Sequence, residues 1–518
     1  MPVTRSMSNL VDAAPLDRRD TEERADQHHG PPRSFDIWSM LALSFSVLGT
    51  WSTGAQGLAT GLYKGGPITV LWGLCVVAVF NVCIAVSLGE LCSSMPNALG
   101  QGFWIARLWD STSGRFTSYI CAWINIFGWW TLSASQMAFM TEFTLGLKIM
   151  FDTDWPAASK GWVHFLLYLG ITWALTLVNL TAGRKDWILP TFNKVIGVWF
   201  VGLFVAFSLA MPISVGTNSE LAFQPASFVF WGWLNRTGWS DGVAFFMGLV
   251  QAAYSLTGYD CVIHMVEEIP SPGRNAPKAM YLSVILGAVT GFIFMVICLF
   301  CIQNVEQVFN PPTGLPFIEV VQESIGLEGG FALILLFVLN GLGQGVSMLT
   351  TASRLTWSFA REGGLPRSAY FAHIDRTWKV PVRAILLQAL IISLVGLLYL
   401  FSNAALDAIL SVSTVALTIS SCIPILVLLL VGRKRLLPGD FNLRVLGPAC
   451  NWMSIVYCAI TSVFFFFPRQ PDPPAGDMNY AVAVFGIMVI VAVGFWFTKG
   501  RSMEQNQLEA PSRTLNSE

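Results

Sequence analysis

Long apolar stretches separated by short polar segments make up most of this chain. A helix crosses the hydrocarbon core of a bilayer, about 30 Å thick, with roughly 20 apolar residues, and stretches of that length recur from residue 37 to residue 497. The pattern therefore predicts an all-α polytopic membrane protein surrounded by lipid. We expect twelve transmembrane helices, at residues 37–62, 67–92, 117–147, 162–181, 188–211, 242–267, 278–302, 330–359, 382–401, 405–431, 447–467 and 480–497.

Two of these spans, the first and the sixth, are interrupted by small and polar residues. The first contains such a run at 46–57, and the sixth carries Thr257, Gly258 and Asp260 where hydrocarbon should lie. Irregular backbone is tolerated at that depth only where protein or a water-filled cavity surrounds it. Breaks five helices apart predict two inverted repeats, at about 37–211 and 242–431, followed by extra helices at 447–497. The alternative is ordinary close helix packing, in which Gly and Ser are common.

Composition and charge exclude several classes of protein. Hydrophobic residues make up 54% of the chain and charged residues 12%, which a soluble protein of this length would not carry. The formal net charge of −1 gives no footprint for a nucleic-acid partner. Most of the ten cysteines lie in apolar runs, with no disulfide or metal-ligand spacing. We therefore expect no cofactor and no metal.

Basic residues are distributed unevenly between the predicted inside and outside loops. Placing the N-terminus inside assigns only Lys64, Lys148, Lys160, Arg236 and Arg469 to outside loops. The positive-inside rule then puts both termini in the cytoplasm. Residues 1–35 and 499–518 are polar and predict cytoplasmic tails, the first of them disordered, around a transporter domain at 36–498. The inside segments collect Arg107, Arg115, Arg184, Lys185, Arg274, Lys278, Arg361, Arg367, Arg376, Lys379, Arg383, Arg433, Lys434, Arg435 and Arg444.

The two breaks are the predicted substrate site. A broken helix offers the N–H groups of one half to a carboxylate and the carbonyls of the other half to an ammonium group. We expect these residues to act mostly through their main chain. The candidates are Gly49, Thr50, Trp51, Ser52, Thr53 and Gly54 on the first span, with Ser255, Leu256, Thr257, Gly258 and Tyr259 on the sixth.

Polar side chains on other spans extend this site. On the eighth span Asn340, Gln344, Ser347 and Thr351 fall on one helical face. Hydrogen bonding between helices is the alternative, but Asn and Gln are costly in lipid, so for Asn340 and Gln344 we favour the pathway. Similar faces carry Asn125, Trp129 and Gln136 on the third span, and Ser411, Thr414, Thr418 and Ser421 on the tenth.

Ionisable residues near the membrane have competing interpretations. Lys194 lies about 6 Å into the fifth span, at 1.5 Å per residue from Pro190. It could exchange a proton as the site opens and closes, or reach back to the headgroups. Asp260 could pair with a cationic substrate, but we favour a helix cap for the second half of the sixth span. His264 is expected to be a satisfied interior histidine. For Glu90, Glu267 and Glu268 we expect gate salt bridges or plain solvation.

Four segments together resemble a known family. They are the first break, residues 87–102 after the second span, residues 257–270 from Thr-Gly-Tyr-Asp to Glu-Glu-Ile-Pro, and residues 340–366 from Asn-Gly-Leu-Gly-Gln to Gly-Gly-Leu-Pro. In this combination the chain resembles fungal permeases of the amino acid/polyamine/organocation (APC) superfamily, in the amino acid/choline branch that includes γ-aminobutyrate (GABA) and choline permeases. The resemblance implies a secondary transporter that works by alternating access, usually coupled to protons. It also implies a lysine near Lys194 in proton-dependent relatives.

The substrate is expected to be a small amino acid or a GABA-like amine. Choline, another organic cation or a polyamine is the alternative, and choline would need an aromatic cage, for which Trp51, Tyr259 and Trp129 are available. A nutrient sensor that binds without transporting is a more remote alternative. A membrane enzyme is not expected, because no catalytic motif is present. With no retention or lipidation signal, the plasma membrane is the default location and the vacuolar membrane the alternative.

Overall fold

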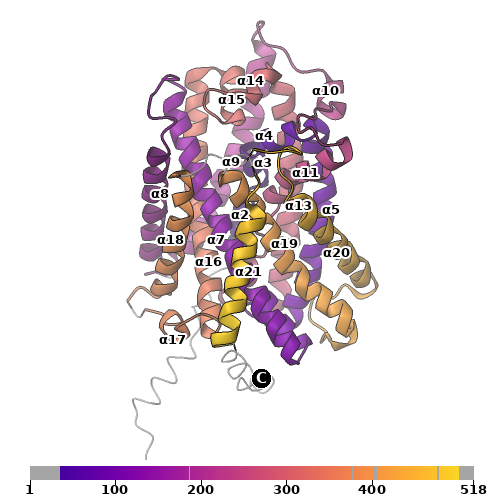
Figure 1. Cartoon of the computed structure of the whole chain (residues 1–518). Coiled ribbons are helices and arrows are strands. Elements are labelled where there is room, and N and C mark those ends of the chain that lie inside the picture. Colours follow the sequence, from indigo (N-terminus) through magenta and orange to yellow (C-terminus); the bar gives the residue numbers. More distant parts are fainter. Residues whose placement is uncertain (1–35, 186, 376, 401–404, 475–477, 501–518) are drawn as a thin grey trace, which may run out of the picture.

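The computed structural model describes residues 36–185, 187–375, 377–400, 405–474 and 478–500. In this part of the chain the regular structure is helical, and β pairing is limited to one isolated bridge between Lys64 and Asn235. The long helices run side by side through a single bundle (Figure 1). Helices α10, α14 and α15 lie at the upper end of this view and α17 at the lower end, and these two ends are called upper and lower below.

The first half of the bundle is built from the interrupted first span and four long helices. The first span consists of α2 (Ile37–Leu48), α3 (Thr50–Gln56) and α4 (Leu58–Tyr63). The helices that follow are α5 (Gly66–Ser94), the short α6 (Gln101–Leu108), α7 (Thr112–Ile149), α8 (Gly161–Ala182) and α9 (Ile188–Thr217).

The second half follows the same plan. After α10 (Ala226–Trp231), the interrupted sixth span consists of α11 (Asp241–Ser255), α12 (Cys261–His264) and the 3-10 turn η1 (Val266–Glu268). The remaining elements are α13 (Pro272–Cys301), α14 (Val305–Phe309), α15 (Pro316–Ile325), α16 (Leu327–Arg361), α17 (Ser368–Phe371), α18 (Val382–Gly396), η2 (Leu397–Leu400), α19 (Ala405–Val431), η3 (Arg433–Arg435), η4 (Arg444–Leu446), α20 (Gly447–Phe464), α21 (Ala481–Phe495) and η6 (Trp496–Gly500).

Nine helices of the described residues are long and apolar enough to cross a membrane. They match nine of the expected spans. The other three expected spans are the interrupted first and sixth spans and α7, which carries the polar residues of the third span. The short helices α6, α10, α14, α15 and α17 were not predicted from the hydrophobic pattern.

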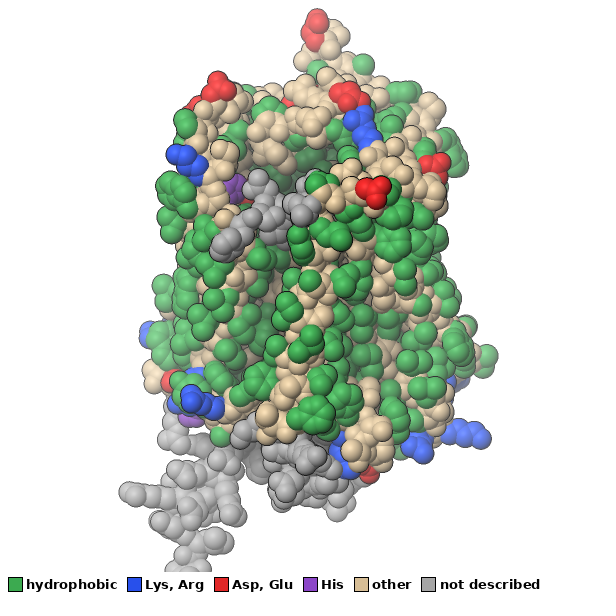
Figure 2. All heavy atoms as spheres, in the orientation of Figure 1, with side chains coloured by type: hydrophobic (Ala, Val, Ile, Leu, Met, Phe, Trp, Pro, Cys, Tyr) green, Lys and Arg blue, Asp and Glu red, His purple; other side chains and the backbone are tan. Residues whose placement is uncertain are grey.

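The surface of the bundle agrees with a bilayer environment. Apolar side chains cover the middle of the face in Figure 2, whereas Lys and Arg gather at its lower edge and most Asp and Glu lie at its upper edge. Large apolar side chains are exposed on the outside of the bundle; Val198 of α9, for example, is 75% exposed and Ile490 of α21 72%. Water would not favour such exposure, but lipid does.

Candidate functional site

The break in the first span occurs at Gly49. Its φ of 55° lies in the left-handed region, which glycine adopts without a Cβ penalty. The carbonyl of Gly49 accepts hydrogen bonds from the hydroxyls of Ser52 (2.8 Å) and Thr53 (3.0 Å). These two hydroxyls are therefore used to shape the break, which leaves its main chain as the recognition surface.

The sixth span is open between α11 and α12, at residues 256–260. Gly258 has a φ of 104°, a conformation that residues with side chains rarely adopt. The hydroxyls of Ser255 and Thr257 donate to the carbonyls of Ala252 (2.9 Å) and Ala253 (2.7 Å) in the last turn of α11. Both breaks thus lie where the sequence predicts them, and each depends on one glycine.

Packing brings the two breaks together. A Cβ on Gly258 would lie 3.2 Å from Val47 Cγ1, just before the first break. On the other side of the breaks, Gln251 of α11 donates from Nε2 to the carbonyl of Gly54 at 2.7 Å. Helix α7 packs against the two breaks as well, because Leu132 and Trp129 of α7 would lie 3.4 Å and 3.7 Å from the same Cβ on Gly258.

Of the two polar candidates on α16, one faces the first break and one does not. Gln344 is 1% exposed, and its Nε2 would lie 3.4 Å from a Cβ on Gly49. This nitrogen has no hydrogen-bond partner among the described residues. Asn340 instead donates from Nδ2 to the carbonyl of Ile196 on α9 at 3.2 Å, which is the helix-to-helix role that the sequence left as the alternative.

The three aromatic residues considered for a cage have different surroundings. Trp51 stacks on Phe200 of α9 with ring centroids 5.0 Å apart and packs against Phe294 of α13 at 4.9 Å. Trp129 donates from Nε1 to Asp260 at 3.3 Å. Tyr259 is buried in the sixth break itself. Trp51 thus belongs to a hydrophobic cluster that also contains Phe204, Phe207 and Phe337. Thr50, the residue before Trp51, packs against α13, because a Cβ added to Gly287 would come close to the Thr50 hydroxyl.

A small cavity lies between the breaks and the upper end. It has a volume of about 30 Å³, room for about two water molecules at 10–15 Å³ each. Tyr254 lines it from α11, and its hydroxyl lies 2.8 Å from Ser135 Oγ on α7. Phe139 packs against the same ring, with centroids 5.9 Å apart. An amino acid would need this narrow space to widen. The other lining residues are Gly57, Thr60, Val250, Gln251, Leu410 and Ser411.

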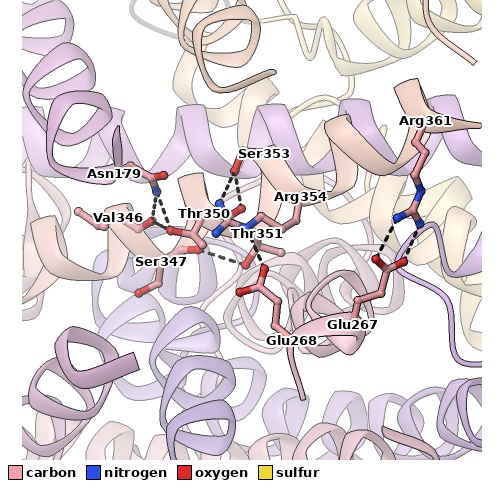
Figure 3. Close-up of polar contacts among 10 residues, drawn as sticks. All are labelled: Asn179, Glu267, Glu268, Val346, Ser347, Thr350, Thr351, Ser353, Arg354 and Arg361. Carbon is pink, nitrogen blue, oxygen red and sulfur yellow. Dashed lines mark hydrogen bonds and ion pairs between the residues drawn. The ribbon is translucent and has the colours of Figure 1, made fainter. Parts of the chain in front are cut away.

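The lower end is closed by ion pairs, as expected for the three glutamates. Arg354 of α16 donates from Nε to Glu268 at 3.0 Å, with both side chains about 5% exposed. Two helical turns further along, Arg361 binds both carboxylate oxygens of Glu267, at 2.6 Å and 2.9 Å (Figure 3). Figure 3 shows both glutamates on the segment that follows the sixth break, pointing toward α16. Arg433 donates from Nη2 alone to both oxygens of Glu90, at 2.7 Å and 2.6 Å.

Asp260 does not cap the second half of the sixth span, which corrects the interpretation from sequence. Its carboxylate makes no hydrogen bond to the backbone of α12. Instead Oδ2 accepts from Gln101 Nε2 of α6 at 3.2 Å and from Trp129 Nε1 at 3.3 Å, and it lies 3.4 Å from His264 Nε2. Tertiary partners replaced the local cap because α6 and α7 bring their N–H donors to a carboxylate that is only 3% exposed.

Lys194 lies at the edge of the bundle. Its Nζ donates to Asp36 Oδ2 at 3.0 Å, and the two side chains are 46% and 52% exposed. The preceding residue, Asn193, faces the interior of the bundle, and its Oδ1 accepts from Ser347 Oγ of α16 at 2.6 Å. The next residue, Val195, is 55% exposed. This placement favours the interpretation in which the lysine reaches back to the headgroups.

Comparison with known proteins identifies the relatives of this chain. The sequence profile of the family described as "Amino acid permease" matches residues 35–493. A choline transporter of Saccharomyces cerevisiae is 29% identical over 510 residues, which cover 97% of this chain and 89% of that protein. A protein of Macrophomina phaseolina, named among the amino acid/polyamine transporters, is 30% identical over 449 residues, covering 86% and 97%. An amino-acid permease homologue of Oryza sativa is 27% identical over 495 residues, covering 90% and 91%.

Proposed function

The chain belongs to the amino acid permease family, and from this premise we propose that it imports a small zwitterionic amino acid or a GABA-like amine together with protons, by alternating access. Membership makes it a multi-pass membrane transporter for small molecules of the amino acid or choline type and not an enzyme. The family implies a fold of two inverted five-helix repeats. We propose twelve spans in this arrangement, with both termini in the cytoplasm and the plasma membrane as the location.

The observation that carries the proposal is the pair of glycine-dependent breaks with an unpaired amide beside them. Gly49 and Gly258 open two helices at the same depth of the bundle. The first turn of α3 offers N–H groups that have no partner within their helix, and Gln344 Nε2 adds a donor that nothing in the described protein uses. Donors of this kind favour a carboxylate. A buried donor without a partner costs about 1–3 kcal/mol, which a substrate carboxylate would recover.

Alternating access is supported by the contrast between the two ends. The lower end is sealed by three Glu–Arg pairs, one of them almost completely buried. The upper end has a cavity next to the breaks that is bounded by the Tyr254 and Phe139 rings. We propose that substrate enters from the upper end and leaves after the ion pairs at the lower end separate.

Choline or another organic cation is the second candidate, because one relative is a choline transporter. An aromatic cage worth about 0.5–2 kcal/mol per contact would be required. The packing of Trp51 among phenylalanines speaks against its taking part. We therefore prefer the zwitterion.

Uptake in a permease-deficient fungal host tests the proposal. Cells expressing the full chain are given tracer GABA, a panel of tracer amino acids and tracer choline at outside pH values below and above that of the cytoplasm. We expect saturable uptake of a zwitterion that rises at low outside pH and is inhibited by unlabelled zwitterions. Competition by choline alone would replace the preferred substrate with the second candidate. Binding without uptake would favour a sensor.

A further inference from the structure

The polar cluster around Asp260 and His264 has a geometry that a neutral histidine beside an ionised aspartate does not satisfy. His264 Nδ1 lies 3.0 Å from the carbonyl of Ala98, and its Nε2 lies 3.4 Å from Asp260 Oδ2. A carbonyl only accepts, so Nδ1 must carry a hydrogen. A neutral imidazole has a single N–H, so its Nε2 would turn a lone pair toward a carboxylate. Nε2 is buried and has no hydrogen-bond partner among the described residues.

One additional proton resolves this conflict. With both ring nitrogens protonated, His264 donates to the carbonyl of Ala98 on one side and forms an ion pair with Asp260 at 3.4 Å on the other. Asp260 also accepts from Gln101 and Trp129, and donors aimed at a carboxylate favour its ionised form. The proton therefore belongs on His264 Nε2, and the pair is an imidazolium bound to a carboxylate. Trp129 packs edge-on against the imidazole with centroids 5.9 Å apart.

No other cation in the described part of the chain forms an ion pair with Asp260. Among the described residues, neither Asp260 nor His264 has a hydrogen bond or ion pair with any further ionisable side chain. Two cations of α16 are already bound by Glu267 and Glu268, and α2 carries no ionisable residue. The ionisable residues on the same segment are Tyr259, Cys261, Glu267 and Glu268. Those near this end of the packed helices are Arg354 and Arg361 of α16, Arg274, Lys278 and Tyr281 of α13, Arg107 of α6, and Arg115, Tyr119 and Cys121 of α7.

We propose that the Asp260–His264 pair is the proton-binding site of the transport cycle, an inference that rests on the proposed proton-coupled function. Removing the proton while the pair stays buried would leave a bare carboxylate next to a lone pair in a site that is at most 3% exposed, which is costly in a low dielectric. The closed lower end therefore holds the proton. Lys194, exposed and bound to Asp36, has no comparable constraint.

The location couples the pair to the lower gate. The residues 98–101 supply both Ala98 and Gln101, and a Cβ on Gly100 would lie 2.6 Å from Ile263 of α12. Four residues after His264, Glu268 binds Arg354. When these contacts separate, water reaches the pair from the lower end. The Nε2 proton of His264 then leaves to the water at the lower end, and water solvates the Asp260 carboxylate in place of the imidazolium. When the lower end closes again, a proton must be bound from the side of the breaks, where Trp129 lies beside Gly258.

Protonation is measured without any substrate by ¹⁵N magnetic resonance of the full chain in liposomes, with labelled histidine. We expect an imidazolium signal near pH 7 that is absent from His264→Gln. In Asp260→Asn the same residue should become a neutral imidazole. His164→Gln is the matched control, since His164 is the other described histidine paired with a carboxylate, Glu142 at 2.9 Å. A neutral His264 near pH 7 in the wild type, without a protonated carboxyl band in the infrared spectrum, would overturn the proposal.

Coupling is measured in the same liposomes with tracer GABA and tracer choline. With the membrane potential clamped at zero, one pH unit sustains about tenfold accumulation if one proton moves with each substrate. We expect His264→Gln to lose this accumulation and to keep counterflow exchange, whereas His164→Gln keeps both. Unchanged accumulation in His264→Gln, or loss of exchange together with accumulation, would assign the pair a structural role only. If the wild type moves neither tracer, the proposed function fails, and the resonance experiment still decides the protonation of the pair.

Discussion

Replacing Gly258 with valine tests whether the sixth break is the transport site. The native φ of 104° is one that valine rarely adopts, and holding a residue in such a region costs about 1–3 kcal/mol. The new Cβ would lie 3.2 Å from Val47 and 3.4 Å from Leu132. The two methyl groups beyond it overpack this space, for about 1–3 kcal/mol more. The open conformation of the break is therefore disfavoured by about 2–6 kcal/mol, or at least about 30-fold in population.

The assay is initial-rate uptake in the permease-deficient host, divided by the amount of tagged protein at the cell surface. We expect uptake by Gly258→Val to fall at least about 30-fold with normal localisation, because the strain is confined to one turn. Gly258→Ala keeps the strain of φ without the methyl groups and should lie in between. Gly202→Val of α9 is the matched control, since Gly202 has an ordinary φ and no atom within 4 Å of its Cβ position. Normal uptake by a correctly located Gly258→Val protein would refute the assignment of the site.

Other substitutions separate the roles assigned to single residues. Gln344→Ala should raise the KM for uptake several-fold. Asn340→Ala removes one interhelical hydrogen bond to the Ile196 carbonyl of α9 and should lower stability by about 0.5–1.5 kcal/mol with little change in KM; equal effects on KM would contradict the distinction. Lys194→Met should keep pH-driven accumulation, measured as a steady-state tracer ratio, and its loss would restore a coupling role for this lysine. Arg354→Met leaves Glu268 buried without a partner and should destabilise the closed lower end by about 3–5 kcal/mol, seen as faster substrate leak from loaded liposomes. Adding Glu268→Gln should recover much of that loss, and a double variant as leaky as the single one would mean that the pair does not close the gate.

The sequence determines the features that depend on local chemistry. Apolar stretches of the right length predict nine helices that the structure confirms as candidate spans. Gly49 and Gly258 mark both breaks, because glycine in a run of small polar residues is the cheapest place for a helix to leave its geometry. The glutamates at the lower end could be predicted to form ion pairs from their position near basic loops.

Only the tertiary structure decides which way a polar side chain faces and what it meets. Asn340 and Gln344 are one turn apart on α16, yet one meets the carbonyl of Ile196 and the other meets the first break. Helical periodicity does not distinguish these positions, because it gives the face of a helix and not its neighbour.

The partners of Asp260 are a further case. Gln101 and Trp129 are 159 and 131 residues away in the chain, so the local cap was the natural expectation from sequence. In a membrane protein most helices are apolar on all sides, and the sequence carries little information about their rotation. The burial of Asp260 with His264, and the exposure of Lys194 beside Asp36, follow from helix packing, which brings N–H donors to one charge and leaves the other at the surface of the bundle.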